Sequence, residues 1–246
     1  MLSVTIITPS YNDAATLLHT VQSVAGQTMP PLEHLIMDGA STDGSITLLQ
    51  STTVTLYSGP DKGMYDAMNK GIVLAKGDII GILNADDFYA SNRVLEQVVE
   101  LFMTTGCDAV YGDLKYVLAT NIQTIQRNWV AGAYTPGAFL KGWMPPHPTF
   151  FVKKSVYEQY GVFNLDLGTA ADYELMLRLI HKHQITLGYL PQTLVHMRTG
   201  GASNQTLLAR FKANRNDALA WKINGLRPGW YTLYAKPLRK LGQFLG

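Results

Sequence analysis

Two adjacent carboxylates, Asp86 and Asp87, stand at the end of an apolar run in the stretch "GILNADDFY" (81–89). Like charges side by side repel each other, and a plain turn or a helix cap can be built from less costly residues. A divalent cation would remove the repulsion, because hard cations take oxygen ligands from carboxylates and phosphates alike. The pair is therefore a candidate metal site that ties a diphosphate to the protein. A solvated turn or a helix cap is the alternative.

Polar residues follow four successive strand-like runs. The runs 4–8, 33–38, 54–58 and 78–83 end in "TPSYND", "DGASTDGS", "SGPDKG" and "NADD". Because ligands of open α/β sheets bind beyond the carboxyl ends of the strands, these four ends predict a polar ligand across the sheet. Neither G-x-G-x-x-G after the first strand nor G-x-x-x-x-G-K-[ST] occurs, so a metal ion is the expected device for holding phosphates. A strand-end turn without a ligand explains Asp38 equally well.

Strand-like runs alternate with helical patterns along the first 113 residues. Apolar residues recur at helical spacing in 64–77 and again in 93–103. This alternation predicts a mostly parallel sheet covered by helices on both faces. Beyond it we expect a hairpin over 115–129, a Gly- and Pro-rich loop over 131–149, helices over 152–161, 170–183 and 204–223, and one or two strands over 185–198.

The composition is that of a globular α/β protein. Of the 246 residues, 47% are hydrophobic and 15% are charged, which allows a sizeable core. The single cysteine, Cys107, excludes an internal disulfide and fits a reducing compartment. We expect no signal peptide and no membrane span, since no apolar stretch approaches ~18 residues. The expected location is cytoplasmic.

The charge is divided unevenly along the chain. Residues 210–246 hold eight Lys or Arg against one acid, Asp217, for a net charge of +7, whereas the rest carries −5. Within "RPGWYTLYAKPLRKLGQFLG" (227–246), aromatic residues stand among the basic ones, a pattern typical of contact with an anionic membrane surface. The alternative is a basic segment packed on the acidic body. We expect no nucleic-acid partner, because no known motif occurs.

Together these segments resemble family 2 glycosyltransferases, which are inverting enzymes with the GT-A fold. The segments that carry the resemblance occur in order between residue 4 and about 180: "VTIITPSYND", "HLIMDGASTDGS", "GPDKGMYDAMNKG", "GDIIGILNADD", "PPHPTFF" and "AADYELMLRL". The wording of the third and fourth is most similar to members that build bacterial exopolysaccharide or O-antigen. The resemblance implies a Rossmann-like nucleotide-binding half with a mostly parallel mixed sheet, and an acceptor-side half.

The resemblance implies a nucleotide-sugar site on the first three strand ends. Thr8, Pro9 and Tyr11 would contact the nucleotide, with Tyr11 offering a ring face to the base. Asp38 would accept a hydrogen bond from the base, and Lys62 would line the pocket. The family often carries a second acid where Met37 stands, a departure that could alter which base is accepted.

The resemblance also assigns the chemistry. Asp87 would ligate the cation (Mn²⁺ or Mg²⁺), and Asp86 would reach the ribose or a metal-bound water. Asp172, in "AADYELMLRL", would be the catalytic base. Its alternative is the N-cap of the helix that follows. Asn84 replaces a frequent Asp of the metal motif, which could weaken metal affinity.

His147 and Arg198 have two readings each, and His196 and Glu174 are weaker candidates. His147 would line the acceptor cleft or simply pack in its loop. Arg198 would pair with the diphosphate or form a surface salt bridge. His196 stands near where some relatives place a metal-binding histidine, but the match is loose and we leave it out of the metal site. Glu174 is a weaker candidate base than Asp172.

We therefore expect a glycosyltransferase domain over 1–205 and a basic, aromatic helical tail over 206–246. Within the domain, 1–113 would bind the nucleotide-sugar and 114–205 the acceptor and base. The expected function is the metal-dependent, inverting transfer of one sugar to a hydroxyl of a glycan or lipid-linked glycan in surface polysaccharide synthesis, with peripheral contact at the inner face of the membrane. The alternatives are a nucleotidyltransferase of similar fold and a catalytically silent nucleotide-sugar-binding module.

Overall fold

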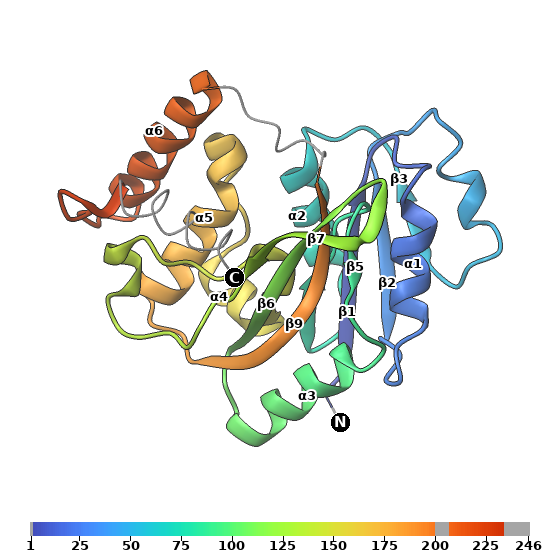
Figure 1. Ribbon diagram of the computed structural model, residues 1–246, viewed down its shortest axis with the longest axis horizontal. Helices are drawn as coiled ribbons and strands as arrows, with labels where there is room; N and C mark the ends of the chain where they lie inside the picture. Colours follow the sequence, from blue (N-terminus) through green and yellow to red (C-terminus); the bar gives the residue numbers. More distant parts are fainter. Residues whose placement is uncertain (1, 200–206, 234–246) are drawn as a thin grey trace.

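The computed structural model describes residues 2–199 and 207–233. Its centre is a mixed sheet in the order β3-β2-β1-β4-β8-β6-β9-β5, with β7 paired to β6 (Figure 1). The strands are β1 Val4–Ser10, β2 Glu33–Asp38, β3 Thr55–Ser58, β4 Ile79–Ile82, β5 Phe88–Tyr89, β6 Ala109–Leu118, β7 Asn121–Trp129, β8 Phe151–Lys153 and β9 Leu187–Thr199.

Strands β1 to β4 form the parallel part of the sheet, as the alternation of strands and helices predicts. The register aligns Ser10 of β1 with Asp38 of β2, and Asp38 with Ser58 of β3. The carboxyl ends of these strands therefore meet at one edge. The polar segments that follow them lie there together.

Helices cover both faces of this part, which confirms the expectation from the sequence. Helix α2 (Met64–Leu74) packs on one face, and α1 (Leu17–Ala25) and α3 (Val94–Thr105) pack on the other. Ile7 of β1 belongs to the first core and its neighbour Ile6 to the second, as the alternation of side chains along a strand requires. Gly71 lets α2 come close, because a Cβ there would lie 2.6 Å from the Cγ2 of Ile7.

The second part of the sheet is built around β6. This strand pairs in parallel with β9 and antiparallel with β7 and β8. The β6–β7 pair confirms the predicted hairpin. Because β6 runs across residue 113, the sheet is continuous at the expected boundary between the two halves, and that boundary stays a prediction.

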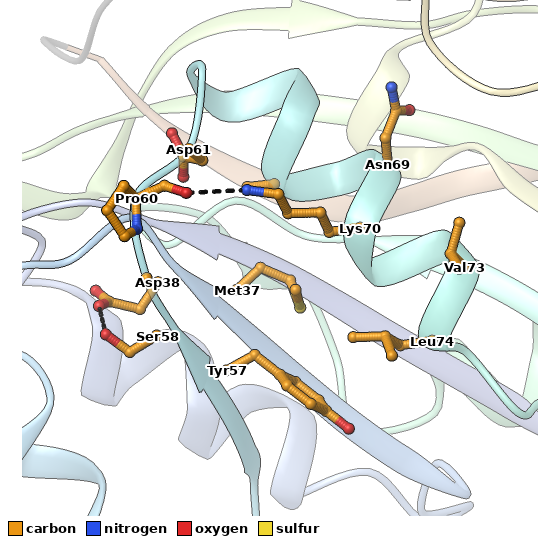
Figure 2. A pocket seen from close by; sticks show the side chains of 12 residues that line it. Met37, Asp38, Tyr57, Ser58, Pro60, Asp61, Asn69, Lys70, Val73 and Leu74 are labelled. Carbon is orange, nitrogen blue, oxygen red and sulfur yellow. Dashed lines mark hydrogen bonds between the residues drawn. The ribbon is translucent and has the colours of Figure 1, made fainter.

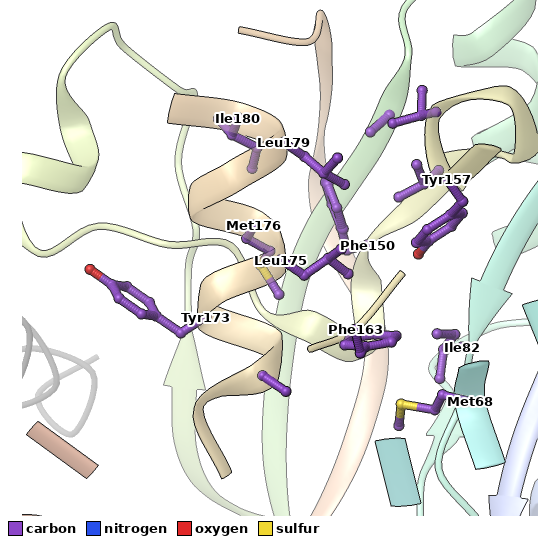
Figure 3. Close-up of a cluster of buried hydrophobic side chains, with 14 of the residues drawn as sticks. Met68, Ile82, Phe150, Tyr157, Phe163, Tyr173, Leu175, Met176, Leu179 and Ile180 are labelled. Carbon is purple, nitrogen blue, oxygen red and sulfur yellow. The ribbon is translucent and has the colours of Figure 1, made fainter. Parts of the chain in front are cut away.

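The remaining helices pack outside β6 and β8. They are α4 (Lys154–Tyr160), α5 (Ala171–Met176) continued by a π-helical turn η5 (Leu177–Lys182), and α6 (Leu207–Ile223), with short 3₁₀ turns η2 (Ala138–Lys141), η3 (His147–Thr149) and η4 (Leu165–Ala170). A further 3₁₀ turn, η1 (Thr47–Leu49), packs with β2 and α1 instead. The predicted helix over 152–161 is wrong at its start, since Phe151–Lys153 forms β8. Figure 3 shows the core between α5 and the sheet, with Phe163 beside Met68 and Ile82.

Helix α6 belongs to the body of the protein. Trp221 is buried, and its indole N–H donates to the Tyr173 hydroxyl at 2.8 Å. The side chain of Thr232 donates to the carbonyl of Leu140 at 2.7 Å. The expected tail over 206–246 is therefore packed on the domain as far as the structure describes it, and its residues 206 and 234–246 lie outside the described residues. Within the described residues, no helix has the length and apolar character to cross a membrane.

A buried ion pair holds α5 against its surroundings. The carboxylate of Glu174 is 2% exposed and accepts from Arg178 at 2.7 and 3.1 Å and from Asn224 at 2.9 Å. The guanidinium of Arg178 also donates to the carbonyls of Tyr160, Gly161 and Val162. The Arg178 guanidinium thus neutralises the buried Glu174 carboxylate and also donates to the backbone carbonyls at the end of α4. Glu174 is occupied by this structural role.

Arg178→Ala is expected to lower the free energy of unfolding by about 3–5 kcal/mol, because it leaves the buried Glu174 charge without its cation. Urea denaturation followed by tryptophan fluorescence measures this loss. Arg93→Ala is the matched control, since the Arg93–Glu96 pair is exposed and its removal should leave the midpoint nearly unchanged. Equal midpoints for the two variants would contradict the structural role of Arg178.

Candidate active site

The loops after β1 and β2 are bonded to each other at the edge where the strands end. The backbone N–H of Asn12 donates to the Ser41 hydroxyl at 2.8 Å, and the side chain of Asn12 accepts from the N–H of Thr42 at 2.9 Å. Next to them, the N–H of Ala14 donates to Asp43 at 2.8 Å. Asn12 adopts a left-handed backbone with φ of 57°. The rim of the site is therefore a fixed structure.

Asp38 lies at the centre of this rim. It is 4% exposed, and its Oδ2 accepts from the Ser58 hydroxyl at 2.6 Å and from the N–H groups of Ala40 and Ser41 at 3.1 Å. These bonds support the strand-end turn that was the alternative for this residue. The Oδ1 atom has only a long contact of 3.4 Å to the N–H of Ser41, so one oxygen retains the capacity to accept from a ligand.

Thr8 does not point its side chain at the rim. Its hydroxyl lies 2.9 Å from the Nε2 of His34, and both residues are buried inside the sheet. Burial lowers the pKa of His34 to about 3, so the imidazole is neutral at physiological pH. Pro9 is likewise buried in β1. Only the backbone of these two residues is left to meet a nucleotide.

Tyr11 is the exposed aromatic residue of the first loop. Its side chain is 66% exposed, and a Cβ on Gly39 would lie 3.3 Å from its ring, so the ring lies against the loop after β2. Asp13 fixes this loop by accepting from the N–H of Tyr11 at 2.9 Å and from the Ser10 hydroxyl at 3.2 Å. The ring face is thus available for stacking, as predicted for a base contact.

Lys62 lies on the loop that joins β3 to α2. Its side chain is exposed, while its N–H donates to Asp66 at 3.0 Å. Beside this loop a pocket of ≈ 550 Å³ opens between β2, β3 and α2 (Figure 2). Asp38 and Pro60 stand at one end of the pocket, and Tyr57 and Leu74 lie further along its wall.

Asp87 is the most constrained residue of the "NADD" segment. Its side chain is 0% exposed, and Oδ2 accepts from the Asn84 amide at 3.1 Å. The Oδ1 atoms of Asp87 and Asn84 have no partner, and no other buried side-chain N or O atom of the described residues shares this state. Burial, followed by the charge of Asp86, raises the pKa of Asp87 well above its usual range.

Arg198 holds the turn that carries the two acids. Its guanidinium donates to the carbonyl of Asp86, contacts Nδ1 of His19 and lies 4.8 Å from the centre of the Phe88 ring. Arg198 is buried, so the surface salt bridge considered from the sequence is wrong. Burial raises the pKa of Asp86, and the charge of Asp13 adds to this effect. Asp13 therefore lies within electrostatic reach of Asp86, which sequence reasoning missed.

The donor atoms at Asp87 fit a hard divalent cation. Two buried oxygens without a partner, one from a carboxylate and one from an amide, are the ligand type that Mg²⁺ and Mn²⁺ take. Among the described residues there is no group of three or more His, Cys, Asp or Glu that could hold a metal alone. A cation here would need further oxygens from a ligand. A nucleoside diphosphate supplies such oxygens.

Asp172 lies in the first turn of α5 without being its N-cap. The helix begins at Ala171, its N-cap is Ala170, and the Asp172 carboxylate accepts from the N–H of Tyr173 at 2.7 Å. The N-cap alternative is therefore wrong. Asp172 is half-buried, so part of its side chain stays accessible to a ligand.

Three ring side chains from other elements lie around Asp172. Its charge raises the pKa of Tyr65, after the larger effect of burial, and opposes the lowering of the pKa of His147 by burial. Burial raises the pKa of Tyr116, and the charges of Asp87 and Asp172 both add to that increase. The Tyr116 hydroxyl is thus within electrostatic reach of both acids. Tyr116 is thus the residue that links the candidate metal ligand and the candidate base electrostatically.

The sequence alone predicted only some of the residues that lie at this candidate site. Asp13 could have been found, because it stands in the same strand-end segment as Tyr11. Tyr65 and Tyr116 carried no signal, since one lies in a helix pattern and the other in a hairpin. His196 packs edge-on against Phe88 with ring centres 5.2 Å apart.

Comparison with known proteins identifies the family. Residues 5–161 match the model of Glycosyl transferase family 2. An uncharacterized glycosyltransferase of Mycobacterium tuberculosis is 31% identical over 195 residues, covering 72% of this chain and 68% of that protein. A PGL/p-HBAD biosynthesis glycosyltransferase of Mycobacterium bovis is 28% identical over 207 residues, covering 81% of this chain and 78% of that protein.

Solved structures share the fold. TarS of S. aureus, residues 1–349 in complex with UDP-GlcNAc, superposes with a TM-score of 0.71 at 14% identity, covering 99% of this chain and 72% of that one. In another TarS structure the match covers only 43% of that protein's chain. The mannosyltransferase PcManGT of Pyrobaculum calidifontis, in complex with GDP-Man and Mn²⁺, has a TM-score of 0.67 at 19% identity, covering 96% of this chain and 69% of that one. The expected GT-A fold is confirmed.

Asp87→Asn is expected to show separately how the buried carboxylate affects the stability of the free protein and how it contributes to metal binding. Without metal at pH 7.5, the variant should melt at a temperature equal to or above wild type, because it carries no desolvated charge. This advantage should shrink as the pH falls through the raised pKa of Asp87, since protonation relieves the same cost in wild type. Differential scanning calorimetry measures both effects.

Added Mn²⁺ with UDP should stabilise only the chain that keeps the carboxylate. At about 100 times the dissociation constant the gain is about 2.7 kcal/mol. Asp166→Asn, an exposed carboxylate on η4, is the control and should respond like wild type. An equal metal-dependent gain in the Asp87→Asn variant would show that the cation is held elsewhere.

Proposed function

This chain belongs to glycosyltransferase family 2 and is a glycosyltransferase, and on that premise we propose that it transfers one sugar from a nucleotide-diphosphate sugar to a glycan hydroxyl with inversion at the anomeric carbon. The observation that carries the proposal is the buried Asp87 carboxylate, which has one oxygen without a hydrogen-bond partner; Asp87 and Asp172 are both within electrostatic reach of Tyr116. The family match speaks against the nucleotidyltransferase alternative.

The proposed site for the nucleotide-sugar donor lies at the edge of the sheet where the loops after β1 and β2 meet. The ring of Tyr11 would stack on the base, the open Oδ1 of Asp38 would accept from it, and the backbone at Thr8 and Pro9 would line its path. Lys62 would approach the nucleotide from the loop before α2, where its exposed side chain is free to move. The support is that the similar TarS and mannosyltransferase structures contain UDP-GlcNAc and GDP-Man.

We propose a divalent cation, Mn²⁺ or Mg²⁺, as the cofactor. Asp87 would hold it through Oδ1, with Asn84 beside it, and Asp86 would face the ribose or the surrounding water. When bound, such an ion supplies Lewis acidity that stabilises the leaving nucleoside diphosphate. The support is the pair of partnerless oxygens here and the Mn²⁺ in the mannosyltransferase structure.

Asp172 is the proposed base. In inverting transfer, the bond between the anomeric carbon and the diphosphate oxygen breaks while the acceptor oxygen bonds to the opposite face of that carbon. The acceptor proton must leave, and a carboxylate within hydrogen-bond reach can take it. Asp172 is half-buried in the cleft and has a single backbone donor in its own helix, so it keeps capacity to accept this proton.

The proposed acceptor is a glycan or lipid-linked glycan of bacterial surface polysaccharide synthesis. The support is the similarity to the PGL/p-HBAD biosynthesis glycosyltransferase of Mycobacterium bovis. We further propose that residues 227–246 contact the anionic inner face of the membrane. Trp230 is 89% exposed, with Tyr231 beside it at 5.5 Å between ring centres, although Thr232 ties the same segment to the body.

Asp172→Asn is expected to slow turnover by about 10²–10⁴-fold while leaving UDP binding unchanged, because only proton removal is lost. The assay measures release of nucleoside diphosphate from UDP-GlcNAc, UDP-glucose or GDP-mannose, in which water serves as the acceptor. UDP affinity is measured by calorimetry, and Asp166→Asn serves as the control. Turnover at the wild-type rate would remove Asp172 as the base, and absence of any turnover in wild type with all three donors would favour a silent binding module.

Trp230→Ala is expected to weaken binding to vesicles that contain anionic phospholipid by about 10-fold, since an exposed indole anchors a peptide at the interface. Co-sedimentation measures the partition, with neutral phosphatidylcholine vesicles as the reference. Val73→Ala, which trims another exposed apolar side chain, should bind like wild type. The membrane role is excluded if the wild-type protein does not bind anionic vesicles, or if Trp230→Ala binds them as well as Val73→Ala does.

A further inference from the structure

The segment that carries Asp172 has little regular structure of its own. Residues Leu165–Ala170 form the irregular turn η4, in which Gly168 departs from helical geometry with φ of 50°. Helix α5 then runs for only six residues before the π-helical turn. A general base must keep its carboxylate in line with the acceptor hydroxyl, so this segment needs support from another element.

Helix α2 supplies that support through two side chains one turn apart. The amide of Asn69 donates to the carbonyl of Phe163 at 2.9 Å and accepts from the N–H of the same residue at 2.9 Å. The ring of Tyr65 packs 5.3 Å from the ring of Phe163. Because residues i and i+4 share a helix face, Tyr65 and Asn69 both contact Phe163, which lies just before η4 begins.

The Tyr65 hydroxyl lies near Asp172. Burial raises the pKa of Tyr65, and the charge of Asp172 adds to that increase, so the hydroxyl is within electrostatic reach of the Asp172 carboxylate. The ring of His147 also packs on Phe163, edge-on with ring centres 5.4 Å apart. Phe163 therefore contacts both Tyr65 and His147, and both of these residues lie within electrostatic reach of Asp172.

The loop that joins β3 to α2, called the donor loop below because it carries Lys62, is bonded to the start of the same helix. Helix α2 starts directly after Lys62 and Gly63, and Asp66 accepts from the N–H of Lys62 while pairing with Lys70 at 3.0 Å. Lys70 also donates to the carbonyl of Pro60 at 3.1 Å (Figure 2). The loop and the first two turns of α2 thus form one bonded unit, and a displacement of the loop would carry Tyr65 with it.

We propose that Tyr65 and Asn69 are positioning residues for the base: Asn69 fixes the backbone of Phe163, and the Tyr65 hydroxyl donates to one carboxylate oxygen of Asp172 so that the other faces the acceptor. Tyr65 keeps its own proton throughout, and the acceptor proton passes to the carboxylate oxygen of Asp172 that does not accept from Tyr65. The inference rests on the proposed role of Asp172 and extends it to the element that follows the donor loop.

Tyr65→Phe tests the hydroxyl while keeping the ring that packs on Phe163. The expected result is a fall in kcat of about 10-fold, the effect of losing one hydrogen bond to a charged group, with KM for the donor and the UDP dissociation constant unchanged within about two-fold. The melting temperature should remain at the wild-type value. The assay is the release of nucleoside diphosphate from the donor that wild type uses fastest.

Tyr189→Phe is the matched control, because its hydroxyl donates to the Asp113 carboxylate at 2.8 Å in a tyrosine–aspartate pair outside the site. Its kcat should match wild type. The proposal is overturned if Tyr65→Phe retains the wild-type kcat, or if its loss of kcat comes with an equal loss of UDP affinity or of thermal stability. Asp172→Asn is measured in parallel: wild-type turnover in that variant would reject the base assignment itself, whatever Tyr65→Phe does.

Discussion

The arrangement of this protein depends on a carboxylate that its fold places out of water without full compensation. Asp87 is 0% exposed, stands next to Asp86, and has one oxygen that no donor reaches. An ionised group in that position raises the free energy of the folded state until a cation or a proton neutralises it. Folded proteins keep such costs mainly at functional sites, where ligand binding removes them.

Hydrogen bonds hold the loops and the turn that surround this charge. The loops after β1 and β2 hold each other through Asn12 and Ser41, and Arg198 holds the turn of Asp86 from β9. The proposed base, Asp172, follows the irregular turn η4, and Asn69 of α2 hydrogen-bonds to the backbone of Phe163 just before that turn. The strand-end loops and the segment of Asp172 are therefore supported by different contacts, and the continuous sheet joins them.

Much of the fold was predictable because its signals are local. The alternation of apolar strands and amphipathic helices up to residue 113 predicted the parallel sheet with helices on both faces, and the strand ends predicted which loops would meet. The sequence did not reveal contacts that depend on long-range pairing. Thr8 was expected to contact the nucleotide, and nothing in the strand pattern shows that its hydroxyl pairs with His34 on the neighbouring strand. A surface salt bridge was one of two readings for Arg198, yet this residue is buried and its guanidinium donates to the carbonyl of Asp86.

The site was predictable to the same extent. Asp38, Asp86 and Asp87 stand at strand ends, where any parallel sheet collects ligand contacts, so their neighbourhood followed from topology. The electrostatic proximity of Tyr65 to Asp172 joins residues more than a hundred positions apart, and no spacing rule predicts it. Tyr116 is comparable, since only the pairing of β6 with β9 sets it near both acids.

Anomalous X-ray scattering from crystals grown with UDP and Mn²⁺ tests the central claim most directly. The account predicts a single strong manganese peak within about 2.0–2.6 Å of the Oδ1 of Asp87, the range of hard-cation bonds to oxygen, with diphosphate oxygens among its other ligands. A peak held by other residues, or UDP bound with no manganese at Asp87, would contradict it.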